Sequence, residues 1–255
     1  MERHHIYSAL VLRVRPSGES NRDAWFLTQE EGILKATVFG GPKSKFRALV
    51  SPFHQGRLWV YHNPVRDSRK LTDFDVQSWR LGIRENYQRT MTAGAILEVI
   101  LASQGSGGNW PSAWGMANST LDALDLAEEG ACLRIFVHFL WSWALLLGIR
   151  PSLNRCASCT CEAPQDGLLL WNTYEGAVYC PSCAGVQEDP GALPPGAWVV
   201  LGLEVRRWLG AVENQAPAAA ARYTLDARSL GQAKALVTSI MAGALGKRLP
   251  GWDRV

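Results

Sequence analysis

Short runs of apolar and β-branched residues, separated by turn residues, dominate the first part of the chain. Five such runs predict strands, and each is closed by turn chemistry such as Pro16-Ser17-Gly18. The predicted strands cover about residues 6–15, 23–28, 33–39, 58–61 and 71–79. Five short strands within roughly eighty residues predict a small five-stranded β-barrel of the OB type.

From about Arg84 the apolar period becomes that of helices, as in Ile96, Val99 and Ile100 with their i, i+3, i+4 spacing. Further helices are predicted over about residues 112–127, 131–148, 197–211 and 229–245. The 131–148 helix is apolar nearly all round, so it should be the buried centre of a helical domain. The pattern predicts an α+β chain with the barrel at residues 1–80 and helices at 81–154 and 186–255.

Charge is unevenly distributed between these parts. Residues 1–80 hold 13 Lys+Arg against 8 Asp+Glu, and the remainder holds 13 against 15. A hydrophobic content of 47% supports a packed core rather than disorder. The longest apolar run, residues 135–149, is shorter than the roughly 18–20 residues that span a bilayer. With no targeting segment evident, we expect a cytoplasmic protein.

Residues 32–66 contain six cations and no Asp or Glu. A β-rich surface that excludes acids presents a positive face, and a phosphate backbone is its obvious partner. Lys35 and Arg57 lie in this stretch and are candidate DNA-binding residues. The alternative is an ordinary solvated surface. Four aromatic residues lie among the cations: Phe46, Phe53, Trp59 and Tyr61. They could stack on unpaired bases or form barrel core, so no stacking residue is assigned.

Two Cys-x2-Cys pairs, Cys156/Cys159 and Cys180/Cys183, are separated by 20 residues. Each pair turns two thiolates toward one point, and two pairs supply the four tetrahedral ligands of a closed structural Zn²⁺ site. A hairpin about Glu175-Gly176 would bring the pairs together within an inserted module at residues 155–185. Cys161 offers an alternative to Cys159, which we favour because its spacing matches the second pair. Four reduced thiols or a disulfide remain the alternatives.

No catalytic constellation is found among the familiar motifs, so we expect the protein not to be an enzyme. A zinc hydrolase or nuclease would need an open metal position, which a four-cysteine set lacks. A second rival is a protein–protein adaptor with weak DNA binding, whose barrel binds a peptide.

Several segments together resemble the bacterial recombination mediator family RecO. They occur in the family's order, and the last seventy residues match only in being helical. The segments are Leu10–Arg22, Leu27–Gly32, Gly40–Phe53, Leu146–Cys159 and Tyr179–Cys183. The resemblance implies an N-terminal OB-fold, a helical domain with a zinc module, and a role in DNA repair and recombination after DNA damage.

The resemblance also implies binding of single- and double-stranded DNA, annealing of complementary strands, and help in loading recombinase on single strands coated by single-strand-binding protein (SSB). The implied partners are RecR and the C-terminal tail of SSB, and the location is nucleoid-associated. An acidic, apolar-ended tail would need a groove between helices with a cation at its mouth, for which Arg134, Arg206 and Arg207 are candidates. The positions that match the family's basic residues are Arg13, Arg15, Arg22, Lys43, Lys45 and Arg47.

Overall fold

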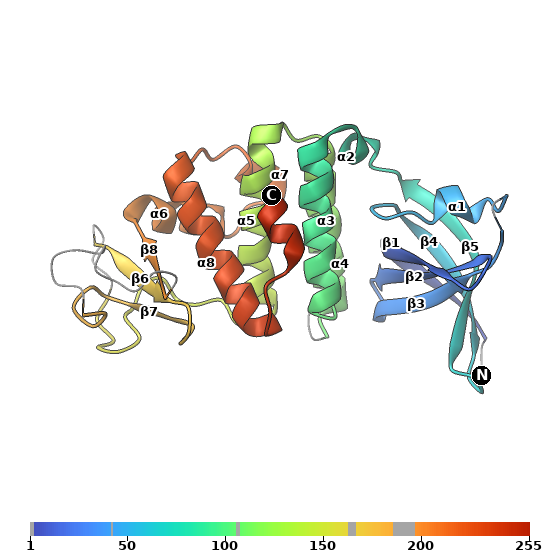
Figure 1. The fold of residues 1–255 in the computed structure, drawn as a ribbon, viewed down its shortest axis with the longest axis horizontal. Helices are drawn as coiled ribbons and strands as arrows, with labels where there is room; N and C mark the ends of the chain where they lie inside the picture. The colour runs from blue at the N-terminus through green and yellow to red at the C-terminus, as the bar shows by residue number, and fades with distance from the viewer. Residues whose placement is uncertain (1–2, 42, 106–107, 163–166, 186–196) are drawn as a thin grey trace. The chain divides into compact units, whose positions relative to one another are not determined.

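The computed structural model describes residues 3–41, 43–105, 108–162, 167–185 and 197–255 (Figure 1). The chain divides into two compact units, Met1–Glu129 and Gly130–Val255. The predicted domain limits at residue 80 and around residues 155–185 stay predictions. None of the helices within the described ranges is long and apolar enough to cross a membrane.

The first unit begins with a closed five-stranded barrel (Figure 1), as predicted. Its strands are β1 (His4–Ser17), β2 (Asn21–Thr28), β3 (Gly32–Val38), β4 (Gln55–Asn63) and β5 (Ser68–Ser78). The strand order is β1-β2-β3-β5-β4, with β3 and β5 parallel and the other neighbours antiparallel. The short helix α1 (Phe46–Leu49) lies between β3 and β4 in the chain. This arrangement is an OB-fold.

Strand alternation fills the barrel, because every second side chain points inward. On β1 the inward residues Tyr7, Ala9 and Val11 join the core, where Phe26 and Phe74 meet with ring centroids 6.0 Å apart.

A β-bulge interrupts the β1–β2 pairing between Val11 and Arg13. The extra residue shifts the alternation, so that Val14 packs against the core and Arg13 and Arg15 take the outward positions. A local irregularity in β1 therefore determines that these two arginines face solvent.

Three helices complete the first unit: α2 (Leu81–Glu85), α3 (Tyr87–Ala102) and α4 (Trp110–Asp125). Arg80, which is 4% exposed, links the barrel to α4. Its guanidinium donates 2.8 Å hydrogen bonds to the backbone oxygen of Phe53, to Asn118 and to Asp122. Because a buried charge needs partners on all its donors, this contact fixes α4 against the barrel.

The second unit contains helices and a small sheet. The helices are α5 (Glu129–Leu146), α6 (Leu203–Val212), α7 (Pro217–Ala220), α8 (Ala227–Leu245) and the 3-10 helix η2 (Pro250–Arg254). The sheet has the order β7-β6-β8, from β6 (Leu169–Asn172), β7 (Ala177–Tyr179) and β8 (Trp198–Leu201). As predicted, α5 is buried along most of its length and β6 and β7 form a hairpin.

The helix predicted from residue 197 was wrong at its start. Trp198–Leu201 is a strand that pairs with β6, and α6 begins only at Leu203. The run Trp-Val-Val-Leu is rich in strand-forming residues, and Gly202 separates it from the helix.

Candidate nucleic-acid interface and metal centre

Outward side chains of β1, β2 and β3 form rows across the three strands, because directly paired residues share a face. The rows, in order along the strands, are Leu10–Leu27–Ile33, Arg13–Trp25–Lys35 and Arg15–Asp23–Thr37. The surface therefore changes from apolar to basic over two residue steps.

The apolar row is covered by the helical part of the first unit. A Cβ built on Gly105, just after α3, would lie 3.2 Å from Ile33 and 3.4 Å from Leu27. The other two rows hold three cations and one acid, Asp23, and are here called the basic rows; they are more open, with Arg15 and Lys35 exposed. The covered row positions α3 and leaves the basic rows to solvent, and these rows are the candidate nucleic-acid interface.

Residues 32–66 contain no acid, but acids from neighbouring strands lie beside their cations in the folded barrel. Asp23 of β2 pairs with Lys35 at 2.7 Å, and Asp73 of β5 pairs with Lys45 at 3.0 Å. Arg57 of β4 lies directly opposite Asp75 of β5. An acid-free sequence stretch therefore does not make an acid-free surface, since cross-strand neighbours come from elsewhere in the chain.

The segment around α1 forms a second basic site at the end of the barrel. Arg22 donates a 2.8 Å hydrogen bond to the backbone oxygen of Phe46 in α1. Burial, and then the nearby charge of Arg47, lower the pKa of Arg22. Lys43 and Arg47 are exposed, and no acid among the described residues lies within ion-pair distance of either.

The candidate DNA-binding residues thus fall into separate places. Arg13, Arg15 and Lys35 share the outer face of β1–β3, while Arg22 and Arg47 meet at α1. Arg57 belongs to neither group, because its row on the barrel is Ser8–Arg57–Asp75. Their roles in binding DNA stay predictions.

The aromatic residues of the acid-free stretch lie away from the row that contains Trp25. Phe53 is buried, and Phe46 packs on the barrel core. Trp59 lies between Ile6 and Asp73. Trp25, which lies in the strand predicted over about residues 23–28, is paired with Arg13 on one side and Lys35 on the other. Only the cross-strand register, which sequence does not reveal directly, could have identified it.

The four predicted cysteines converge. The sulfur atoms of Cys156, Cys159, Cys180 and Cys183 all lie within 4.8 Å of one another. The Cys159 and Cys180 sulfurs are 3.9 Å apart. That separation matches the edge of a tetrahedron of thiolates about 2.3 Å from Zn²⁺, roughly 3.8 Å, and is far longer than a disulfide bond. The set fits a tetrahedral metal ion.

Backbone hydrogen bonds build the site. The Ala157 N–H donates to Val178 of β7 at 2.8 Å, so the hairpin holds the first pair beside the second. Both pairs close with the same turn, in which Thr160 donates to the Cys156 oxygen and Ala184 to the Cys180 oxygen. This repeated turn explains why two separate Cys-x2-Cys pairs present their sulfurs alike.

The surroundings of one of the four thiols lower its pKa, which favours the thiolate form that binds a metal. Burial raises the pKa of Cys156, but hydrogen bonds from the backbone at Cys159, Cys180 and Ser158 outweigh it and lower the pKa to about 6. The hydrogen bond with Cys180 leads the causes that raise the pKa of Cys183 to about 12. Metal binding must therefore displace a proton from Cys183.

Cys161 is not part of the cluster. Among the described residues, the group that can hold a metal contains Cys159 and not Cys161. Cys161 is exposed, and its backbone oxygen accepts the Cys156 N–H at 3.1 Å. Cys161 therefore contributes a backbone hydrogen bond to the turn that begins at Cys156, and no metal ligand.

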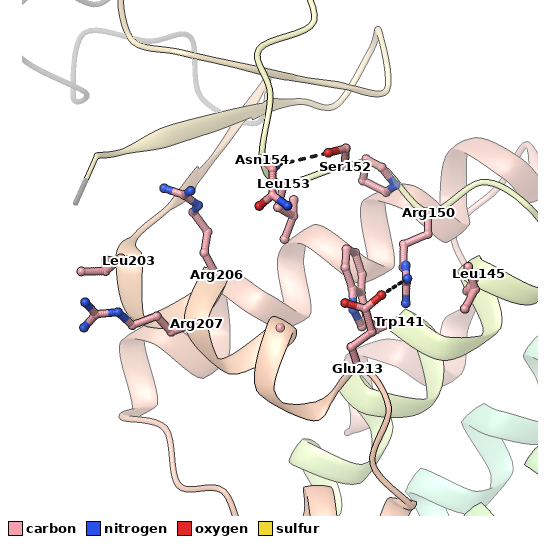
Figure 2. A pocket seen from close by; sticks show the side chains of 12 residues that line it. Trp141, Leu145, Arg150, Ser152, Leu153, Asn154, Leu203, Arg206, Arg207 and Glu213 are labelled. Atoms are coloured by element: carbon pink, nitrogen blue, oxygen red, sulfur yellow. Dashed lines mark hydrogen bonds and ion pairs between the residues drawn. The ribbon is translucent and has the colours of Figure 1, made fainter. Parts of the chain in front are cut away.

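A cavity of about 590 Å³ opens between α5, α6 and residues 150–154 in the second unit (Figure 2). Arg150, Arg206 and Arg207 line it together with Trp141 and other residues. Arg134 does not line it, because its guanidinium donates to the backbone oxygens of Gly130 and Ala221.

Arg150 lies 5.1 Å over the Trp141 ring and pairs with Glu213, as the dashed line in Figure 2 shows. Its Nη1 is buried and has no hydrogen-bond partner among the described residues. Arg207 is exposed, 3.7 Å from Glu204. The cavity thus joins an apolar wall to positive groups.

Barrel and cysteine cluster together define an OB-fold protein with a four-cysteine site. The family model described as "Recombination protein O N terminal" matches residues 1–78, and "Recombination protein O C terminal" matches residues 84–252. The chain therefore belongs to the RecO family of DNA repair proteins.

Curated relatives carry the name "DNA repair protein RecO". The protein of Solidesulfovibrio magneticus is 28% identical over 213 residues, which cover 82% of each chain. That of Rubrobacter xylanophilus is 28% identical over 73% of this chain and 75% of its own. That of Bacillus subtilis is 25% identical over 72% of this chain and 70% of its own.

Proposed function

We propose that this protein is a recombination mediator that binds single- and double-stranded DNA and anneals complementary strands. With RecR it helps to load recombinase on strands coated by SSB. The observation that carries the proposal is the basic outer face of β1–β3, on an OB barrel, in a chain of a DNA repair family. This activity needs no covalent chemistry.

The mechanism is electrostatic. Cations of the barrel neutralise phosphates and release condensed counterions, which drives binding without regard to base sequence. Two complementary strands repel each other less once their phosphates are neutralised, so they remain close enough to pair. The two basic sites, at β1–β3 and at α1, are separate surfaces on which two strands can be held.

The cations differ in what they can contribute. Arg13, Arg15, Arg22, Lys43 and Arg47 are free of direct ion pairs among the described residues, so each can neutralise a phosphate. Lys35 and Lys45 must share their charge with Asp23 and Asp73. Asp75 lies opposite Arg57, as Asp23 lies opposite Arg15, so each of these two arginines acts beside an acid although neither forms an ion pair among the described residues.

We assign the cysteine cluster to a structural Zn²⁺. The four sulfurs fill the coordination sphere, so the ion holds the two turns together and has no open position for a substrate. Metal analysis of the purified protein tests this, with one zinc per chain expected. A protein that folds without metal would overturn the assignment.

We propose that the SSB tail binds in the arginine-lined cavity of the second unit. An acidic peptide with an apolar, carboxylate-bearing end matches an apolar wall at Trp141 and Leu145 flanked by three arginines. Two of these arginines pair with acids, Arg150 with Glu213 and Arg207 with Glu204, and the peptide would compete with those acids. The cavity volume lies within the ordinary range of ligand sites, about 300–1,000 Å³. Exposed Arg207 lies where it can meet the acidic part of the peptide.

A labelled tail peptide tests this placement by fluorescence anisotropy. Gly210 lines the cavity with open space beside it, so Gly210→Leu should fill the cavity and abolish binding. Arg207→Ala should weaken binding, while Arg228→Ala, an exposed arginine of α8 outside the cavity, serves as the charge-matched control. Equal binding by the wild type and Gly210→Leu would remove the tail from this cavity.

The rival function is an adaptor with weak DNA binding. DNA affinity measured across a salt series separates the two. A mediator shows affinity for single and double strands that falls steeply with salt, because phosphate contacts dominate. Weak binding that is insensitive to salt would favour the adaptor.

A further inference from the structure

We infer that Trp25 is a base-stacking residue that gives the barrel its preference for unpaired strands. The inference rests on the proposed DNA binding and goes beyond it, because phosphate contacts alone do not distinguish an unpaired base from a paired one. Stacking needs an aromatic face, and every nucleobase can use one.

The register places Trp25 at the centre of the basic row. Its direct neighbour on β1 is Arg13 and its direct neighbour on β3 is Lys35. Of the described aromatic residues in the barrel strands, Trp25 is the one flanked on both sides by Lys or Arg. Two cations spaced across one aromatic ring can hold the phosphates on either side of a single nucleotide.

The ring is available to a base. Trp25 is half-buried, and Lys35 Nζ lies 5.2 Å from its ring centroid. The Lys35 side chain is 53% exposed and pairs with Asp23 at 2.7 Å, so when a base arrives a phosphate must draw the ammonium away from both Asp23 and the ring. The same strand continues on the outer face to Leu27, in the row covered by the helices, which fixes the backbone that carries the ring.

Trp59 supplies a matched comparison. It is also a half-buried tryptophan on the outer face of the barrel, but its row neighbours are Ile6 and Asp73. A base stacked there would have no cation at either row neighbour, and Lys45, which pairs with Asp73, lies outside the row. Trp59 should therefore contribute nothing to DNA binding.

The test compares Trp25→Leu with Trp59→Leu on three DNA probes of equal length. These are a thymine oligonucleotide, the same backbone made of abasic sites, and a duplex. Trp25→Leu should lose about tenfold in affinity for the thymine strand, the loss expected for one stack, and nothing on the other two probes. Trp59→Leu should behave as wild type, and Trp25→Phe should retain most of the affinity.

Thermal unfolding of each variant separates a folding defect from lost stacking, since a misfolded protein loses affinity for all three probes. Equal loss on the thymine and abasic strands by folded Trp25→Leu, or no loss on either, would overturn the inference. Failure of the proposed function is a different result, in which wild type binds none of the probes even at low salt.

Discussion

Acid partners should decide which cations of the α1 segment contribute to DNA binding. Lys43 and Arg47 are exposed and, within the described part of the chain, lack an acid at ion-pair distance, whereas Lys45 lies 3.0 Å from Asp73. We predict that Lys43→Ala with Arg47→Ala weakens binding strongly, while Lys45→Ala changes it little.

The magnitude follows from counterion release. Each phosphate contact on a single strand contributes about 0.7 to the slope of log K against log salt. Removing two contacts should reduce the slope by about 1.4, so the loss relative to wild type shrinks about sevenfold between 50 and 200 mM salt. The Lys45–Asp73 pair is exposed on both sides and stabilises the fold by less than about 1 kcal/mol. A DNA phosphate can displace Asp73 from Lys45, but the repulsion between Asp73 and the phosphate offsets most of the binding free energy that is gained.

Fluorescence anisotropy with a labelled oligonucleotide, repeated at several salt concentrations, measures the slope directly. Lys45→Ala is the control for charge, since it also removes one cation from the same segment. An unchanged slope in the double variant would show that the segment makes no phosphate contacts. If Lys45→Ala lowered the slope by about 0.7, half the change expected for the double variant, Asp73 would not neutralise Lys45 and this reasoning would be refuted.

Three further predictions concern folding. Cys180→Ser should lose the bound metal and lower the melting temperature while Cys161→Ser changes neither, as metal analysis and calorimetry can show; equal effects would place Cys161 in the site. Arg80→Ala should lower the free energy of unfolding by about 2–4 kcal/mol in urea titrations, because three hydrogen bonds are lost and buried acceptors are left unpaired; a change below 0.5 kcal/mol, roughly the noise of a surface substitution, would contradict this. Burial, then the hydrogen bond to Glu31, raise the pKa of Tyr7 to about 12, so the folded protein retains a proton that the unfolded chain loses near pH 10. Stability should therefore fall as pH rises from about 10 to 12, and less so in Tyr7→Phe; identical pH profiles in urea titrations would be evidence against it.

The barrel and the cysteine cluster could be predicted because their signals are local. Alternation and turn residues place each strand to within a few residues, and the Cys-x2-Cys spacing places four sulfurs on two turns. Trp198–Leu201 was assigned to a helix because a short apolar run next to a helix has no period of its own. Its pairing with β6 is a tertiary contact.

The charge of the barrel surface could not be predicted, because it depends on contacts between residues far apart in sequence. Whether Lys35 or Lys45 is neutralised depends on Asp23 and Asp73, which neighbour them only after the barrel closes. Arg80 likewise gave no signal, since its partners lie 27 to 42 residues away in sequence. Positive charge can be counted along a chain, but whether an acid compensates it depends on which residues the folded barrel brings together.

The most direct test of the account is annealing of two complementary oligonucleotides coated with SSB, followed by fluorescence quenching across a salt series. The account predicts that the protein accelerates annealing at low salt and that the acceleration fades as salt rises, because phosphate neutralisation drives it. Absence of acceleration at any salt, by a protein that still binds both strands, would contradict the proposed mediator function.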